Sequence, residues 1–162
     1  MTFPTELADT QKRKMIPVTT VTQDIDAPIG EVWAIVSAWG SEKLWFPNMM
    51  RSSLEGFGVG SVRTLTFKPG DFTVSERLEA VDPLAHTLSY ALIRNPDHDR
   101  AKYPRGSIVL DDLGGAKTRF TWSCKASWVD ENFKAEFVNM ITGMYSEAID
   151  CLGKLLAASE ER

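Results

Sequence analysis

The middle of the chain, residues 52–128, most restricts what this sequence can fold into. It consists of short runs rich in Val, Thr, Phe, Tyr and Leu, separated by Gly, Pro, Asp and Asn, and it has no long stretch with helical spacing. This pattern predicts an antiparallel meander, in which each strand follows its neighbour through a short turn. The predicted strands are residues 52–57, 61–67, 72–81, 87–94, 103–110 and 117–128.

The segments on either side complete an α+β fold. Residues 16–25 alternate and are rich in Val and Thr, which predicts a further strand. Pro28 and then Ser41 begin two short helices. From residue 131 to residue 156, apolar side chains recur at i, i+3 and i+4, which predicts a long amphipathic helix with Asp130 as its N-cap. We therefore predict a seven-stranded curved antiparallel sheet wrapped around the C-terminal helix.

Length and composition favour one domain and exclude several functions. The 162 residues predict a flexible tail over residues 1–15 and a single ligand-binding domain over residues 16–158. A net charge of −4 gives no broad attraction for nucleic acid. No apolar run is long enough to span a membrane and residues 1–15 hold no secretion signal, so we expect a cytoplasmic protein. With two isolated cysteines and two histidines, we expect no metal and no cofactor.

Successive turns of a meander lie at alternate ends of the sheet. Residues 68–71, 95–102 and 128–130 therefore share one end, and the longest loop is among them. We expect an open mouth at this end, with His98 beside it, and a closed floor with His86 at the other end.

The predicted hairpin over residues 61–81 places a charge pair on the sheet face that points into the core. If the chain turns symmetrically about residues 68–71, the facing pairs are Phe67 with Phe72, Leu65 with Val74, and Arg63 with Glu76. Two charges inside an apolar wall need each other to offset the cost of losing water. The pair is either a buried stabilising contact or a polar anchor for a ligand.

The same alternation in the later strands predicts an aromatic inner wall that carries hydroxyl groups. The side chains predicted to point inward are Leu88, Tyr90, Leu92, Tyr103, Arg105, Ser107, Val109, Phe120, Trp122, Cys124 and Ala126. Together with neighbouring core positions they give the predicted ligand-binding residues: Trp45, Leu65, Phe67, Phe72, Val74, Tyr90, Arg105, Ser107, Trp122, Phe137, Ile141 and Met144.

The order of strand, two short helices, meander and long helix resembles the helix-grip proteins of the START and birch-pollen-allergen superfamily. Residues 58–63 (Gly-Val-Gly-Ser-Val-Arg), 75–82 (Ser-Glu-Arg-Leu-Glu-Ala-Val-Asp) and 88–90 (Leu-Ser-Tyr) are similar to the polyketide cyclase/dehydrase branch and to the plant abscisic acid receptors. This resemblance implies that Glu76 and Tyr103 line the ligand pocket. Residues 68–71 (Lys-Pro-Gly-Asp) lack the receptors' Ser-Gly-Leu-Pro gate, which argues against hormone sensing by that gate.

The resemblance implies two classes of function. One is an enzyme, a cyclase, dehydratase or isomerase that encloses a polyketide-like substrate of secondary metabolism. In it, Glu76 would be the base, Tyr103 the hydroxyl donor, and Arg63 the group that stabilises an enolate or carboxylate. The alternative is a non-catalytic carrier or sensor of a hydrophobic ligand. The expected partner is a small hydrophobic molecule, and a homodimer is compatible with the sequence.

Overall fold

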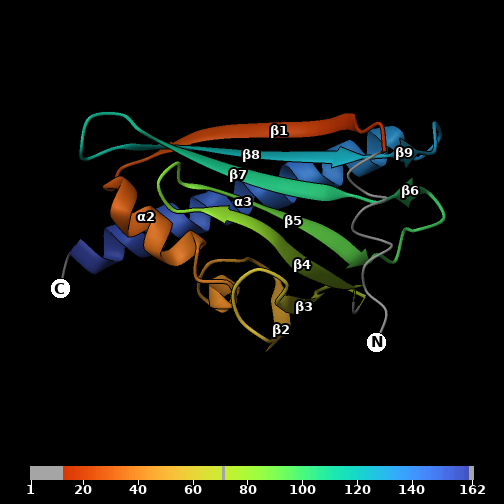
Figure 1. Cartoon of the computed structure of the whole chain (residues 1–162), viewed down its shortest axis with the longest axis horizontal. Coiled ribbons are helices and arrows are strands. Elements are labelled where there is room, and N and C mark those ends of the chain that lie inside the picture. The colour runs from red at the N-terminus through yellow and green to blue at the C-terminus, as the bar shows by residue number, and fades with distance from the viewer. Residues whose placement is uncertain (1–12, 71, 161–162) are drawn as a thin grey trace.

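A curved seven-stranded antiparallel sheet and one long helix form the body of the protein (Figure 1). The structure is a computed structural model that describes residues 13–70 and 72–160. The helices are α2 (Ile29–Val36), the 3₁₀ helix η1 (Ser41–Leu44) and α3 (Lys134–Glu160). The strands are β1 (Ile16–Ile25), β2 (Met49–Glu55), β3 (Val62–Phe67), β4 (Phe72–Asp82), β5 (Thr87–Arg94), β6 (Ala101–Lys102), β7 (Arg105–Asp112), β8 (Thr118–Ala126) and β9 (Trp128–Val129).

The seven strands lie in the order β1-β8-β7-β5-β4-β3-β2, and β6 pairs separately with β9. Helix α3 runs along one face of this sheet, and α2 lies near one end of it (Figure 1). The main core joins the sheet to α2 and α3 through fully buried side chains such as Phe120 on β8 and Leu152 on α3. Burying one such side chain contributes about 1.5–3 kcal/mol. The predicted α+β helix-grip class is confirmed.

The hairpin of β3 and β4 has the predicted register. Arg63 lies opposite Glu76, and the two flanking pairs also match the prediction. Strand β5 has the predicted bounds. Helix α3 begins three residues later than predicted, because residues 131–133 form a turn in which the Asp130 side chain accepts a hydrogen bond from the Asn132 amide at 2.9 Å.

The predicted strand over residues 103–110 is wrong in both its start and its inward face. Tyr103 adopts a left-handed conformation with φ 52° and Pro104 follows it, so β7 begins only at Arg105. Tyr90 lies opposite Gly106 on the neighbouring strand. Gly106, Ile108 and Leu110 are therefore the buried positions of β7.

Two other strands differ at their ends, and one prediction falls outside the description. Strand β2 ends at Glu55 because Gly56, with φ 75°, turns the chain. The predicted strand over residues 117–128 is divided into β8 and β9. Most of the predicted tail, residues 1–12, lies outside the described residues.

In the part of the chain that the structure describes, no helix has both the length and the apolar character needed to cross a membrane.

Candidate functional site

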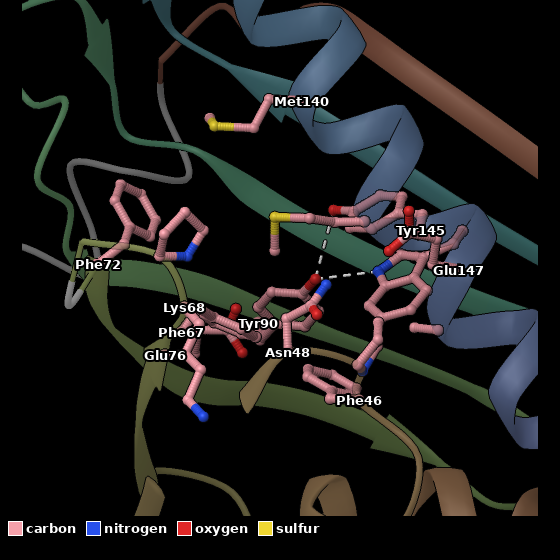
Figure 2. Close-up of a pocket in the computed structure, with 15 residues that line it drawn as sticks. Phe46, Asn48, Phe67, Lys68, Phe72, Glu76, Tyr90, Met140, Tyr145 and Glu147 are labelled. Atoms are coloured by element: carbon pink, nitrogen blue, oxygen red, sulfur yellow. Dashed lines mark hydrogen bonds between the residues drawn. The ribbon is translucent and has the colours of Figure 1, made fainter. Parts of the chain in front are cut away.

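A cavity of about 320 Å³ lies between the β3–β4 hairpin, the segment 46–48 and helix α3 (Figure 2). Its walls are mostly aromatic rings and methionines: Phe46, Phe67, Phe72, Tyr90, Trp122, Met140, Met144 and Tyr145. Its charged lining residues are Lys68, Glu76 and Glu147. A second cavity of about 40 Å³ shares Glu76, Tyr90 and Met144 with the first. An apolar space with a few polar groups is the usual form of a small-molecule site.

The inward charge pair predicted from the hairpin is present. Nε and Nη2 of Arg63 each lie 2.7 Å from Oε2 of Glu76. Arg63 is 4% exposed and Glu76 is 7% exposed, and Glu76 also lines the cavity. Both contacts use the same carboxylate oxygen, so Oε1 of Glu76 has no hydrogen-bond donor among the residues that the structure describes. This oxygen can accept a further hydrogen bond.

A second carboxylate contacts the same guanidinium. Oε2 of Glu42, on η1, lies 3.5 Å from Nη1 of Arg63, and Glu42 is only 1% exposed. The Cζ atom of Arg63 lies 3.6 Å from the centre of the Trp39 ring, which is a close cation–π contact. Arg63 is thus held by two carboxylates and an aromatic face. Sequence reasoning missed Glu42, because a short polar turn has no apolar spacing that would signal burial.

Two tyrosine hydroxyls meet at the cavity wall (Figure 2). Nε1 of Trp122 donates to the hydroxyl oxygen of Tyr90 at 2.9 Å, and the hydroxyls of Tyr90 and Tyr145 are 3.4 Å apart. The rings of Trp122 and Tyr145 stack with centres 4.1 Å apart. An indole N–H can only donate, and each tyrosine hydroxyl carries one proton. The contact between the two hydroxyls uses one of these protons, so the other can be donated to the neighbouring Cys124 sulfur or to a ligand.

These hydroxyls are neutral donors. Burial raises the pKa of Tyr90 well above its ordinary value, and the nearby charge of Glu76 raises it further. Burial likewise raises the pKa of Tyr145, and it raises the pKa of the Cys124 thiol to about 12. All three groups keep their protons near neutral pH, so they serve as hydrogen-bond donors and not as bases or nucleophiles.

Gly106 allows the Tyr90 ring to occupy its position. A Cβ atom added at residue 106 would lie 2.2 Å from Cζ of Tyr90, which is far inside van der Waals contact. A glycine within a strand often marks such a close approach. The sequence therefore held a signal for this contact, since Gly106 lies inside the predicted strand.

Most of the predicted ligand-binding residues lie at or behind the two cavities. Phe67, Phe72, Tyr90, Trp122 and Met144 line the larger one. Val74, Phe137 and Ile141 line the smaller one. Trp45 and Leu65 are buried in the core and line neither cavity.

Three predicted site residues lie elsewhere. Tyr103 is 39% exposed and stacks under the guanidinium of Arg13, so the predicted hydroxyl donor is outside the cavity. Arg105 and Ser107 are on the outer face of β7, where Arg105 pairs with Glu79. The reversed face of β7 explains the errors at Arg105 and Ser107, and the left-handed backbone at Tyr103 explains the third.

The two histidines also lie away from the cavity. His98 is exposed and lies 3.1 Å from Asp99. The ring of His86 packs edge-on against Trp33, with centres 5.4 Å apart. Among residues 13–70 and 72–160, no group of three or more His, Cys, Asp or Glu side chains is arranged to hold a metal ion.

The sequence prediction omitted several lining residues, of which Tyr145 is the most important. Tyr145 is four residues after Ile141 and three before Ala148, so it belongs to the same apolar stripe of α3. That spacing was sufficient to find it. Asn48 and Glu147 also line the cavity, and neither belongs to an apolar pattern.

The fold is that of a helix-grip domain, and an apolar cavity lies between its sheet and its long helix. Residues 17–157 match the family described as polyketide cyclase / dehydrase and lipid transport, and the chain belongs to this family.

Solved structures with the same fold include three of different kinds. The protein XoxI of Bacillus cereus is similar with 23% identity and a TM-score of 0.76, over 88% of this chain and 96% of that one. Norcoclaurine synthase of Thalictrum flavum, in complex with dopamine and hydroxybenzaldehyde, has 20% identity and a TM-score of 0.71, over 98% and 95%. Zhui aromatase/cyclase of a Streptomyces species has 16% identity and a TM-score of 0.66, over 92% and 96%. At these identities the likeness establishes the fold.

Proposed function

We propose that the cavity binds a small, largely apolar molecule and that the protein is a cyclase- or dehydratase-like enzyme of secondary metabolism. The observation that carries this proposal is that Glu76 opens onto the same cavity as the Tyr90 and Tyr145 hydroxyls. The family description and the shared fold with an aromatase/cyclase support the same class. A cytoplasmic location remains a prediction from the sequence.

The cavity restricts the ligand. A volume of about 320 Å³ lies at the lower end of the range of about 300–1,000 Å³ for small-molecule pockets. The rings of Phe46, Phe72 and Trp122 favour a flat or aromatic body. The polar atoms of Glu76 and the two tyrosines favour oxygen-bearing groups, such as the carbonyl and hydroxyl groups of a short poly-β-ketone.

The proposed reaction uses these groups for an intramolecular aldol step followed by loss of water. A tyrosine hydroxyl donates to a ligand carbonyl, and Glu76 removes a proton from the adjacent carbon. The resulting enolate carbon attacks a second carbonyl carbon of the same molecule and forms a carbon–carbon bond. Glu76 returns this proton to the alkoxide oxygen that the attack creates, which becomes a hydroxyl. Glu76 then removes the remaining proton from the attacking carbon, a carbon–carbon double bond forms as the hydroxyl departs, and the hydroxyl takes up that proton from Glu76 and leaves as water. Enclosure in the cavity holds the flexible chain in the reactive conformation.

A non-catalytic carrier is the second candidate, and one observation favours it. Glu76 already accepts a hydrogen bond from Arg63 and is the ion-pair partner of this buried guanidinium, which is a structural role that requires no catalysis. A carrier requires only the apolar walls and the hydrogen-bonding groups.

Three variants separate the two functions. Glu76→Gln removes the base and keeps the shape of the side chain. Glu79→Gln is the matched control, because Glu79 is on the same strand and also pairs with arginine, but faces outward. Tyr90→Phe removes one hydroxyl. Binding is followed by the fluorescence of anilinonaphthalene sulfonate, and turnover by mass spectrometry with an N-acetylcysteamine thioester of a tetraketide.

For the enzyme, we expect Glu76→Gln to bind the probe and to lose product formation by about 10²–10⁴-fold, while Glu79→Gln keeps both. Unchanged turnover in Glu76→Gln would refute the assigned base. Probe binding in every variant, without product in the wild type, would favour the carrier.

A further inference from the structure

Strand β2 forms one edge of the sheet, and its outer side has no pairing strand in the described part of the chain (Figure 1). An unpaired edge offers free N–H and C=O groups to another strand, and proteins commonly protect such edges with lysine or proline. Residues 49–57 contain neither, and the one irregularity in the pairing of β2, between Met49 and Arg51, lies before the regular stretch 51–55. Arg51, Ser53, Leu54 and Glu55 are all exposed along this edge.

The charges on β2 are complementary to those of a second copy. If two β2 strands run antiparallel with Ser53 opposite Ser53, Arg51 of each copy lies opposite Glu55 of the other. Arg51 and Glu55 are on the same, outer face of the sheet, because they pair with Thr66 and Val62 of β3. A two-fold axis at Ser53 therefore creates two identical Arg–Glu pairs across the strands.

An apolar side chain beside this axis is exposed in the single chain. Leu54 is 42% exposed and is on the opposite face from Arg51, and in the paired arrangement it lies next to Ser52 of the second copy. Association would remove part of the Leu54 side chain from water.

The other edge of the sheet lacks these features. Strand β1 contains Asp24 as its one charged residue, and Pro17 lies near its start. Asp24 already lies 3.0 Å from Arg119 of the neighbouring strand. Two β1 strands would bring no opposite charges together.

We propose that the protein forms a two-fold homodimer in which the β2 edges of two copies pair antiparallel about Ser53 and extend the sheet across both molecules. This inference is independent of the proposed function, because neither Glu76 nor the tyrosine hydroxyls take part in it.

Charge reversal tests the register. Because of the two-fold axis, Arg51→Glu alone places like charges opposite each other twice, and so does Glu55→Arg alone. We expect each single variant to weaken the dimer at least about tenfold, and the double variant Arg51→Glu/Glu55→Arg to restore wild-type association. Sedimentation velocity over a range of protein concentrations measures this, with circular dichroism to verify folding. Single variants that associate like the wild type, or a double variant that fails to recover, would overturn the proposed pairing.

A cysteine placed on the axis gives a second test that does not depend on the strength of association. Residues directly opposite in an antiparallel pair have Cα atoms about 4.5–5.5 Å apart, which is within reach of a disulfide. We expect Ser53→Cys to form a covalent dimer under mild oxidation, whereas the wild type and Thr22→Cys on β1 do not. A wild type that stays monomeric at every concentration, together with no crosslink through Ser53→Cys, would refute the homodimer and leave β2 free for a different strand.

Discussion

Two Arg–Glu clusters lie on opposite faces of β4, and they have inverse compositions. On the inner face one arginine, Arg63, lies between Glu42 and Glu76. On the outer face one glutamate, Glu79, lies between Arg77 and Arg105. The inner cluster has an excess negative charge and the outer cluster an excess positive charge.

The two clusters also differ in how fully their carboxylates are used. Both oxygens of Glu79 are paired, Oε1 with Arg77 and Oε2 with Arg105. Glu76 uses only Oε2 toward Arg63, and it borders a cavity. An Arg–Glu pair is therefore not itself a sign of function. What distinguishes Glu76 is an unused oxygen beside an apolar space that a ligand can enter.

Removal of Arg63, the arginine at the centre of the inner cluster, should have the largest effect on stability. Arg63→Met leaves Glu42 and Glu76 buried without a counter-charge, and we expect the free energy of unfolding to fall by about 3–5 kcal/mol. Arg105→Met leaves Glu79 paired with Arg77, and its expected loss is about 0–1 kcal/mol. Urea unfolding followed by circular dichroism measures both variants. Equal decreases in the free energy of unfolding for the two variants would show that the inner and outer clusters contribute equally to stability.

The inner hydroxyls should make stability sensitive to alkaline pH. Folding raises the pKa of Tyr90, Tyr145 and Cys124, so the unfolded chain releases these protons at lower pH than the folded protein does. Their contribution is complete below about pH 8, under the unfolded pKa of the cysteine, and it decreases as the pH rises through the range between the unfolded and the folded values. The expected slope is about 1.4 kcal/mol per pH unit for each group.

Urea unfolding between pH 8 and pH 11 measures this decrease. Tyr145→Phe should make the slope shallower, because one buried hydroxyl is gone. Tyr103→Phe is the matched control, since Tyr103 is outside the cavity and partly exposed. If Tyr103→Phe made the decrease of stability with pH shallower and Tyr145→Phe did not, the assignment of the buried hydroxyls would be contradicted.

A smaller effect is expected from changing one small residue on either face of β7. Gly106→Ala places Cβ against the Tyr90 ring, and we expect a loss of about 1–3 kcal/mol together with a changed near-ultraviolet circular dichroism spectrum. Ser107→Ala on the outer face should change stability by less than about 0.5 kcal/mol. Gly143→Ala on α3, where an added Cβ meets no atom within 4 Å, should be neutral or stabilising. A Gly106→Ala variant with the stability of the wild type would mean that the Tyr90 ring does not lie against residue 106 of β7.

The hairpin of β3 and β4 was predictable because two local rules agree there. Alternation fixes which side chains share a face, and the short turn about residues 68–71 fixes the register. Arg63 and Glu76 follow directly from those rules. Tyr145 was predictable in the same way, from the apolar spacing of α3.

The rest of the site depends on packing that local patterns do not encode. Tyr103 and Pro104 interrupt the chain before β7, and one displaced residue reverses the face of every following side chain. Glu42 is buried because η1 packs over Arg63, a contact between residues 21 positions apart. Short segments of this kind show no periodicity from which their burial could be predicted.

The proposed function requires that the space beside Glu76, Trp122 and Met144 contains no protein atoms. A crystal of the protein held under xenon pressure tests this without any knowledge of the natural ligand, because xenon enters empty apolar cavities. We expect a xenon atom within the cavity of about 320 Å³, in contact with Trp122 and Met144. Side chains that fill this space, with no xenon bound there, would contradict the ligand site.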